Sequence, residues 1–156
     1  MQAIGDKEII AFEVGENWDS SPHHQHIGIW LSGRKLNPID DVVYLPTFRG
    51  KLASEIDRLT NNAFRVDDCE DDRDAIYRRV SENLDHQILN YDVSICVANT
   101  FFLEVGDRGK VLFSFWDERH DPSDEIGIVF EADVDKATIV KALNQLATQI
   151  EGSHGG

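Results

Sequence analysis

The sequence has 156 residues, 41% of them hydrophobic, and this length is typical of one domain that buries enough apolar surface to fold without disulfides or metals. Lys and Arg number 15 against 29 Asp and Glu, which gives a formal net charge of −14. Such a surface repels phosphate backbones and anionic lipids, so it argues against nucleic-acid and membrane partners. The same charge attracts basic proteins.

The first part of the chain is predicted to contain three strands. Short β-branched or alternating apolar segments at 8–14, 26–31 and 42–45 are typical of strands. The segments between the first two strands and after the second, 17–22 and 32–35, are rich in turn-forming residues such as Gly, Pro, Asn and Ser. We therefore expect the chain to begin with a meander of these three strands.

Two helices are predicted in the middle of the chain. The first follows an N-cap at Thr47, and its apolar residues recur at spacings of three and four. These residues are Leu52, Ile56, Leu59 and Ala63. The second begins near Asp72 or Asp74, where acids suit the N-terminal end of the helix dipole. Its apolar residues are Ile76, Val80, Leu84 and Ile88.

The last third returns to strands, predicted at 93–105, 110–116 and 126–130, with a hairpin loop at 106–109. A final helix is predicted after a cap at Asp133 or Asp135. The order β-β-β-α-α-β-β-β-α predicts an α+β fold with a mainly antiparallel sheet of about six strands and about three helices packed on one of its faces. We expect one domain over 1–151 and a flexible C-terminal tail at 152–156.

The only histidine cluster contains His23, His24 and His26, and Asp19 is a potential fourth zinc ligand. The adjacent side chains of His23 and His24 would point apart in an extended chain, and the sequence has no second pair of ligands with metal-site spacing. We therefore expect no structural metal and no cofactor. A small metal-dependent hydrolase that uses these histidines remains an alternative.

Other catalytic signatures are absent from the sequence. It contains no strand-to-helix phosphate loop and no G-x-S-x-G motif, so no catalytic residue is predicted. Cys96 lies in an apolar run and is expected to be buried, whereas the acids around Cys69 would raise the pKa of its thiol. With no signal peptide or membrane-spanning run expected, we predict a location in the reducing cytoplasm.

Acidic residues gather in two segments. The run 67–74 contains six acids and one base, and the loop 117–125 contains five acids. Both are explained either as solvated connections between regular elements or as docking surfaces for a basic protein. The candidate residues for docking a protein partner are Asp67, Asp68, Glu70, Asp71, Asp72, Asp74, Asp117, Glu118, Asp121 and Asp124. If these acids are only solvated, exposed aromatic residues, first Trp18 and Trp116, are the next candidates.

The segments Ile4-Gly5-Asp6 and 11–14, the run 27–33 and the strand entry at 91–93 resemble a bacterial immunity-protein family. It is the forty-second catalogued immunity family of polymorphic toxin systems, which are related to contact-dependent inhibition. The resemblance implies a non-catalytic protein that binds the C-terminal domain of a cognate secreted toxin in the cytoplasm and neutralises it. The expected toxin is a nuclease. A protein that holds phosphates is basic, and the acidic surface of this chain would attract it.

A third interpretation is an acidic nucleic-acid mimic that inhibits another DNA-binding protein. Gene context separates the immunity protein from the hydrolase and the nucleic-acid mimic, because an immunity gene should directly follow the C-terminal end of a large toxin gene.

Overall fold

The computed structural model describes residues 2–66, 72–82, 84–91 and 97–154. In chain order its main elements are β1 (Gln2–Asp6), β2 (Ile10–Asn17), β3 (His24–Leu31), β4 (Arg34–Lys35), β5 (Val42–Tyr44), α1 (Leu45–Asn61), α2 (Arg73–Ser81), β6 (Ala98–Val105), β7 (Arg108–Phe115), β8 (Phe130–Asp133) and α3 (Lys136–His154). Short 3-10 helices lie at η1 (Trp18–Ser20), η2 (Leu84–His86) and η3 (Ser123–Glu125). The predicted α+β class is confirmed, with antiparallel strands divided between two sheets.

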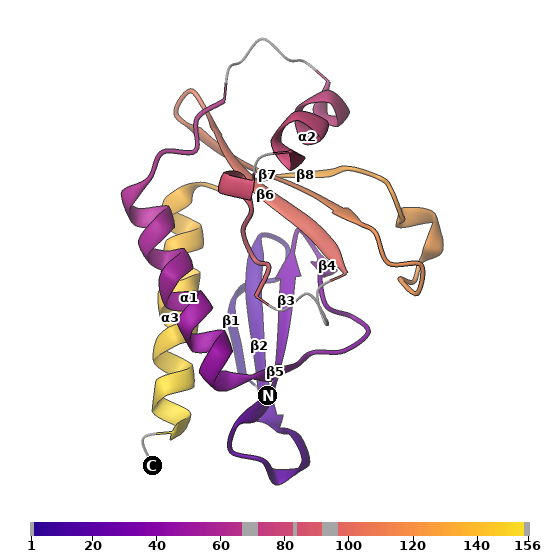
Figure 1. The fold of residues 1–156 in the computed structure, drawn as a ribbon. Helices are drawn as coiled ribbons and strands as arrows, with labels where there is room; N and C mark the ends of the chain where they lie inside the picture. Colours follow the sequence, from indigo (N-terminus) through magenta and orange to yellow (C-terminus); the bar gives the residue numbers. More distant parts are fainter. Residues whose placement is uncertain (1, 67–71, 83, 92–96, 155–156) are drawn as a thin grey trace.

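The first sheet has the order β1-β2-β3-β4, and β5 also pairs with β3 (Figure 1). Strand β4 pairs with β3 near Leu31, whereas β5 pairs with it near His24, so both short strands lie along the same edge of β3. The turn between β3 and β4 consists of Ser32 and Gly33, whose φ angles of 51° and 79° are both positive. Two positive φ angles in a two-residue loop match the right-handed twist of the strands that it joins.

The second sheet has the order β6-β7-β8 and is apolar on both faces. On one face, Phe102 and Phe113 belong to the main core. On the other face, Phe101 and Leu103 pack with Val80 of α2. Successive residues of a strand point to opposite faces, so a run of apolar residues needs a cover on each side. The prediction of a single sheet with all helices on one face is therefore wrong. The strands form two sheets, and α2 covers the face of the second sheet that points away from the main core.

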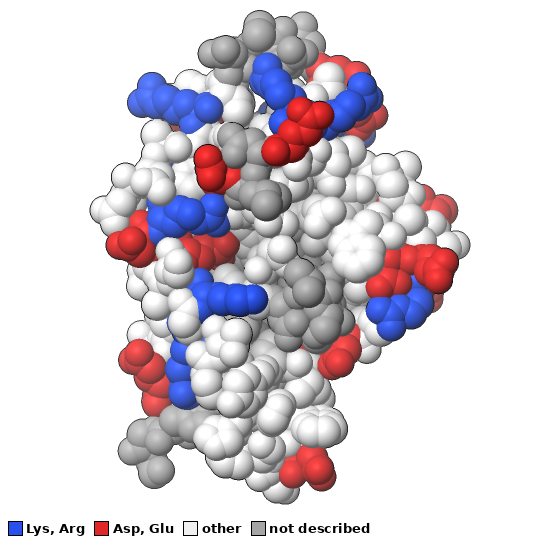
Figure 2. Space-filling model, viewed as in Figure 1, with Lys and Arg blue, Asp and Glu red and all other residues white. Residues whose placement is uncertain are grey.

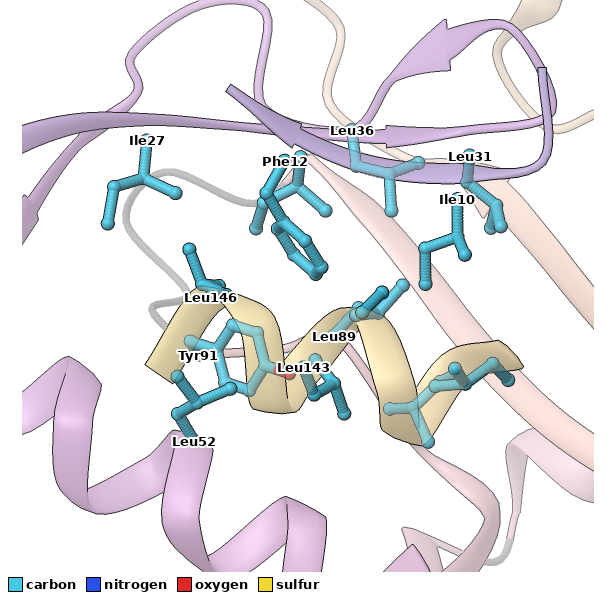
Figure 3. Packing of buried hydrophobic residues seen from close by; sticks show 14 of the residues in the cluster. Ile10, Phe12, Ile27, Leu31, Leu36, Leu52, Leu89, Tyr91, Leu143 and Leu146 are labelled. Carbon is cyan, nitrogen blue, oxygen red and sulfur yellow. The ribbon is translucent and has the colours of Figure 1, made fainter. Parts of the chain in front are cut away.

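The main core lies between the first sheet and the long helices. Figure 1 shows α1 and α3 side by side, and α3 also packs on β1 and β2. In Figure 3, Phe12 and Ile27 of the sheet point toward Leu143 and Leu146 of α3. These side chains are fully or almost fully buried, as is Leu52 of α1. The apolar stripe predicted for the final helix is therefore the face that closes the core.

The ends of the first two helices differ from their predicted positions. Helix α1 begins at Leu45, with Pro46 in its first turn, so Thr47 lies inside the helix and does not cap it. Proline is tolerated there because the first N–H groups of a helix have no intrahelical partner. Helix α2 ends at Ser81, and the chain near Ile88 instead pairs with β6, where the Ile88 N–H donates to the Thr100 carbonyl oxygen at 3.0 Å.

The strand predicted at 126–130 begins only at Phe130, because Gly127 has a φ of 81° that interrupts extended pairing. The cap at Asp135 is confirmed, since its carboxylate accepts from the Thr138 N–H at 2.8 Å. Helix α3 continues to His154, within the segment predicted as a tail. Part of the strand predicted at 93–105, up to residue 96, lies outside the described residues, as do Cys69 and Cys96. In the described part of the chain, no helix has the length and apolar character needed to cross a membrane.

Candidate interaction surface

The acidic run 67–74 is described only at its end. Asp67, Asp68, Glu70 and Asp71 lie outside the described residues. Asp72 is the N-cap of α2, and its carboxylate accepts from the Asp74 N–H at 2.9 Å. Both acids are exposed, so the capping role of Asp72 leaves its charge at the surface.

The loop 117–125 presents only some of its acids to solvent. Asp117 is almost fully buried, and its two oxygens accept from Arg119 at 3.0 and 2.7 Å. These hydrogen bonds hold the pKa of Asp117 at about 2, well below its usual value. Glu118, Asp121 and Asp124 are exposed. In Figure 2 acidic groups gather over this loop beside basic ones. The structure therefore leaves three of its predicted docking acids available to a partner.

A second set of contacts fixes this loop to the first sheet. Glu125 accepts from His120 Nε2 at 2.9 Å and from Arg34 Nε of β4 at 3.2 Å. Burial opposes ionisation of Glu125, but these two hydrogen bonds outweigh it and lower the pKa of the carboxyl. The His120 ring stacks on Phe115 at 3.7 Å between centroids, and Arg34 lies over the Phe130 ring at 4.0 Å. The exposed acids thus stand on a firmly attached loop.

The histidines predicted as an alternative metal site have separate partners. His24 Nδ1 lies 3.0 Å from the Ser21 hydroxyl, and His26 Nδ1 lies 2.7 Å from Asp41. Asp41 also accepts from Lys35 Nζ at 3.0 Å. Among the residues that the structure describes, no group of three His, Cys, Asp or Glu side chains is placed to hold a metal ion. This part of the molecule offers the hydrolase interpretation no ligand set.

A buried polar site was missed by the sequence analysis. Glu55 occupies the apolar face of α1, three residues after Leu52, and only 6% of its surface is exposed. Its carboxyl oxygens accept from the Leu89 N–H at 3.0 Å and from the Tyr91 hydroxyl. Burial raises the pKa of Glu55 to about 7. An acid within a helical apolar stripe was the signal that could have indicated this site.

Arg58 completes the attachment of this segment to α1. Its guanidinium donates to the carbonyl oxygens of Asp85, at 2.8 Å, and Gln87. A depression of about 220 Å³ lies beside these contacts. It is lined by Lys51, Ser54, Glu55, Arg58, Gln87, Asn90 and Tyr91. Because the polar groups of Glu55 and Arg58 are engaged by the backbone and by the Tyr91 hydroxyl, we interpret the site as structural.

Comparison with known proteins gives a match in structure. No family model matches the sequence, and no curated protein matches it. The crystal structure of CdiI from Burkholderia dolosa AUO158 matches with a TM-score of 0.71 over 95% of this chain and 99% of that one. The chain has the fold of this CdiI. The sequence identity is 12%, and a match at this level shows the fold alone. At the level of the fold, the predicted resemblance to an immunity protein is confirmed.

Proposed function

We propose that this chain is an immunity protein that binds the toxin domain of a contact-dependent inhibition system in the cytoplasm and neutralises it without catalysing a reaction. The observation that carries the proposal is the structural match to CdiI, a contact-dependent inhibition immunity protein, over nearly the whole length of both chains. Because a shared fold alone does not define a function, the proposal also depends on the charge of the surface.

The charge indicates the chemistry of the toxin. A net charge of −14 favours a basic partner, and the exposed carboxylates of Glu118, Asp121 and Asp124 are part of that field. A nuclease domain fits this requirement because it carries basic residues that hold phosphates. We therefore propose a basic nuclease domain as the cognate toxin.

The direct test is coexpression with the toxin domain encoded immediately upstream. We expect the toxin domain alone to stop growth, and coexpression of this chain to restore it. An inactivated toxin domain should copurify with this chain at a fixed stoichiometry and show no detectable binding to an unrelated immunity protein. Failure to bind the upstream domain in calorimetry, together with failure to restore growth, would contradict the proposal.

Removing the three exposed acids of the loop should slow toxin association. We expect a Glu118→Gln, Asp121→Asn, Asp124→Asn variant to associate about three- to tenfold more slowly at low salt, because opposite charges steer diffusional encounter. The difference should shrink near 0.15 M salt, where the Debye length is about 8 Å. Stopped-flow association rates across a salt series measure this effect.

A matched control separates local charge from net charge. Glu82→Gln, Asp107→Asn and Asp133→Asn remove the same number of charges from exposed positions elsewhere on the chain. Equal slowing by both triple variants would show that the loop has no special part in docking.

A further inference from the structure

Three rings form a row at one end of the first sheet, and the two outer rings are exposed. The Trp18 and His24 ring centroids are 5.8 Å apart, and those of His24 and Tyr44 are 5.3 Å apart. Trp18 belongs to η1, whereas His24 and Tyr44 are directly paired across β3 and β5. Both Trp18 and Tyr44 have 48% of their surface exposed. We call this row the aromatic tip.

The loop before β3 holds the aromatic tip in place. The Ser21 N–H donates to the Trp18 carbonyl oxygen at 2.9 Å, and the Ser21 hydroxyl contacts the His24 ring at 3.0 Å. The Asn17 side chain donates to the His24 carbonyl oxygen at 3.2 Å. A surface that is already ordered loses less conformational entropy on binding, so these contacts favour the use of the tip as a binding surface.

The backbone of this loop is also unusual. Asp19 and Ser20 have φ angles of 51° and 57°, so two consecutive residues other than glycine adopt the left-handed conformation. Such residues cost free energy and are concentrated at binding sites and switches. Here they follow Trp18 directly and turn the chain so that the indole lies against His24.

The chemistry around the aromatic tip favours a cationic partner group. Glu16 and Asp19 are exposed beside Trp18, and the sequence contains no Lys or Arg between Lys7 and Arg34. The lower end of the molecule in Figure 2, formed by the loop before β3, shows uncharged and acidic groups without a basic one. A guanidinium can stack on an indole or phenol ring and pair with a carboxylate at the same time.

We propose that the aromatic tip is the centre of the toxin-docking surface, and that its rings receive arginine or lysine side chains from a basic face of the toxin domain. This inference rests on the proposed function and assigns the contact surface within it. Trp and Tyr are among the residues that contribute most to binding when they lie at the centre of an interface. The exposed acids of the loop 117–125 then steer the encounter, and the tip holds the complex together.

The test measures binding of an inactivated upstream toxin domain to variants of the full chain. We expect Trp18→Ala and Tyr44→Ala each to weaken the dissociation constant by about thirtyfold or more, mainly through faster dissociation. Trp18→Phe should recover part of the loss because it keeps an aromatic face. Ile9→Ala is the matched control, since Ile9 is 41% exposed at the opposite end of β2 from Trp18. Trp116→Ala tests the other tryptophan, which is 51% exposed.

Circular dichroism should show that each variant keeps the wild-type fold, since both rings are half exposed. If wild-type protein binds the toxin and both tip variants bind equally well, the aromatic tip is not the docking surface, although the proposed function stands. A large loss in Trp116→Ala alone would overturn the assignment in favour of the other tryptophan. If wild-type protein does not bind the toxin domain, the proposed function and this inference both fail.

Discussion

Stability toward urea should fall as the pH rises from 5 to 8, with Glu55 as the main cause. Burial raises the pKa of this carboxyl from 4.5 to about 7 in the folded protein. Between these two values the folded state keeps a proton that the unfolded state releases. The favourable contribution is therefore complete below pH 4.5 and is lost as the pH rises to 7. At 1.36 kcal/mol per pKa unit, the loss approaches about 3 kcal/mol.

Replacing Glu55 with Gln should flatten this pH profile. The amide has a similar shape and does not ionise, so the free energy of unfolding should change much less between pH 5 and 8. Asp57→Asn is the matched control, because Asp57 is exposed on the same helix. Urea titrations at several pH values measure the effect. An unchanged slope in Glu55→Gln would show that another group causes the pH dependence.

The second large effect is expected at Gly109. A Cβ atom there would overlap the Val134 carbonyl oxygen and lie 2.7 Å from the Asp135 Cα. Because both neighbours are backbone atoms at the junction of β8 and α3, Gly109→Ala must displace one chain segment. Overpacking of this kind costs about 1–3 kcal/mol and occasionally more.

Gly50→Ala provides the opposite case on the same protein. Gly50 lies within α1, and a Cβ atom there would meet nothing within 4 Å. Alanine should therefore raise the free energy of unfolding by up to about 1 kcal/mol through helix propensity. Thermal and urea unfolding of both variants give the comparison. Equal stability of the two variants would contradict the close approach at Gly109.

The sequence pattern predicted most elements but not their division into two sheets. The alternation at 26–31 and the spacing of apolar residues in the final helix were sufficient to identify β3 and α3. Hydrophobic periodicity reports how many faces are buried and gives no information on which element covers each face. Strand β1 was missed because only Ile4 of its five residues is buried, which leaves almost no pattern.

The candidate site was only partly predictable for a related reason. Composition located the acids of the loop 117–125, but their pairing depends on residues far along the chain. Arg34, which pairs with Glu125, is 91 positions away. Trp18 was predicted as a secondary candidate, whereas its neighbour Tyr44 reaches the aromatic tip only through the pairing of β3 with β5. Contacts set by strand pairing are not visible in local sequence.

The packing of α3 on β1 and β2 sets a delay on folding during synthesis. A nascent chain cannot close its core until the residues 136–154 have left the ribosome, because the strands that they cover were made first. At roughly 5–20 residues per second, synthesis of the intervening segment takes about 7–30 s. Throughout this time the first sheet lacks the part of its cover that α3 supplies, so a nascent chain cannot fully bury Phe12 and Ile27 until α3 forms.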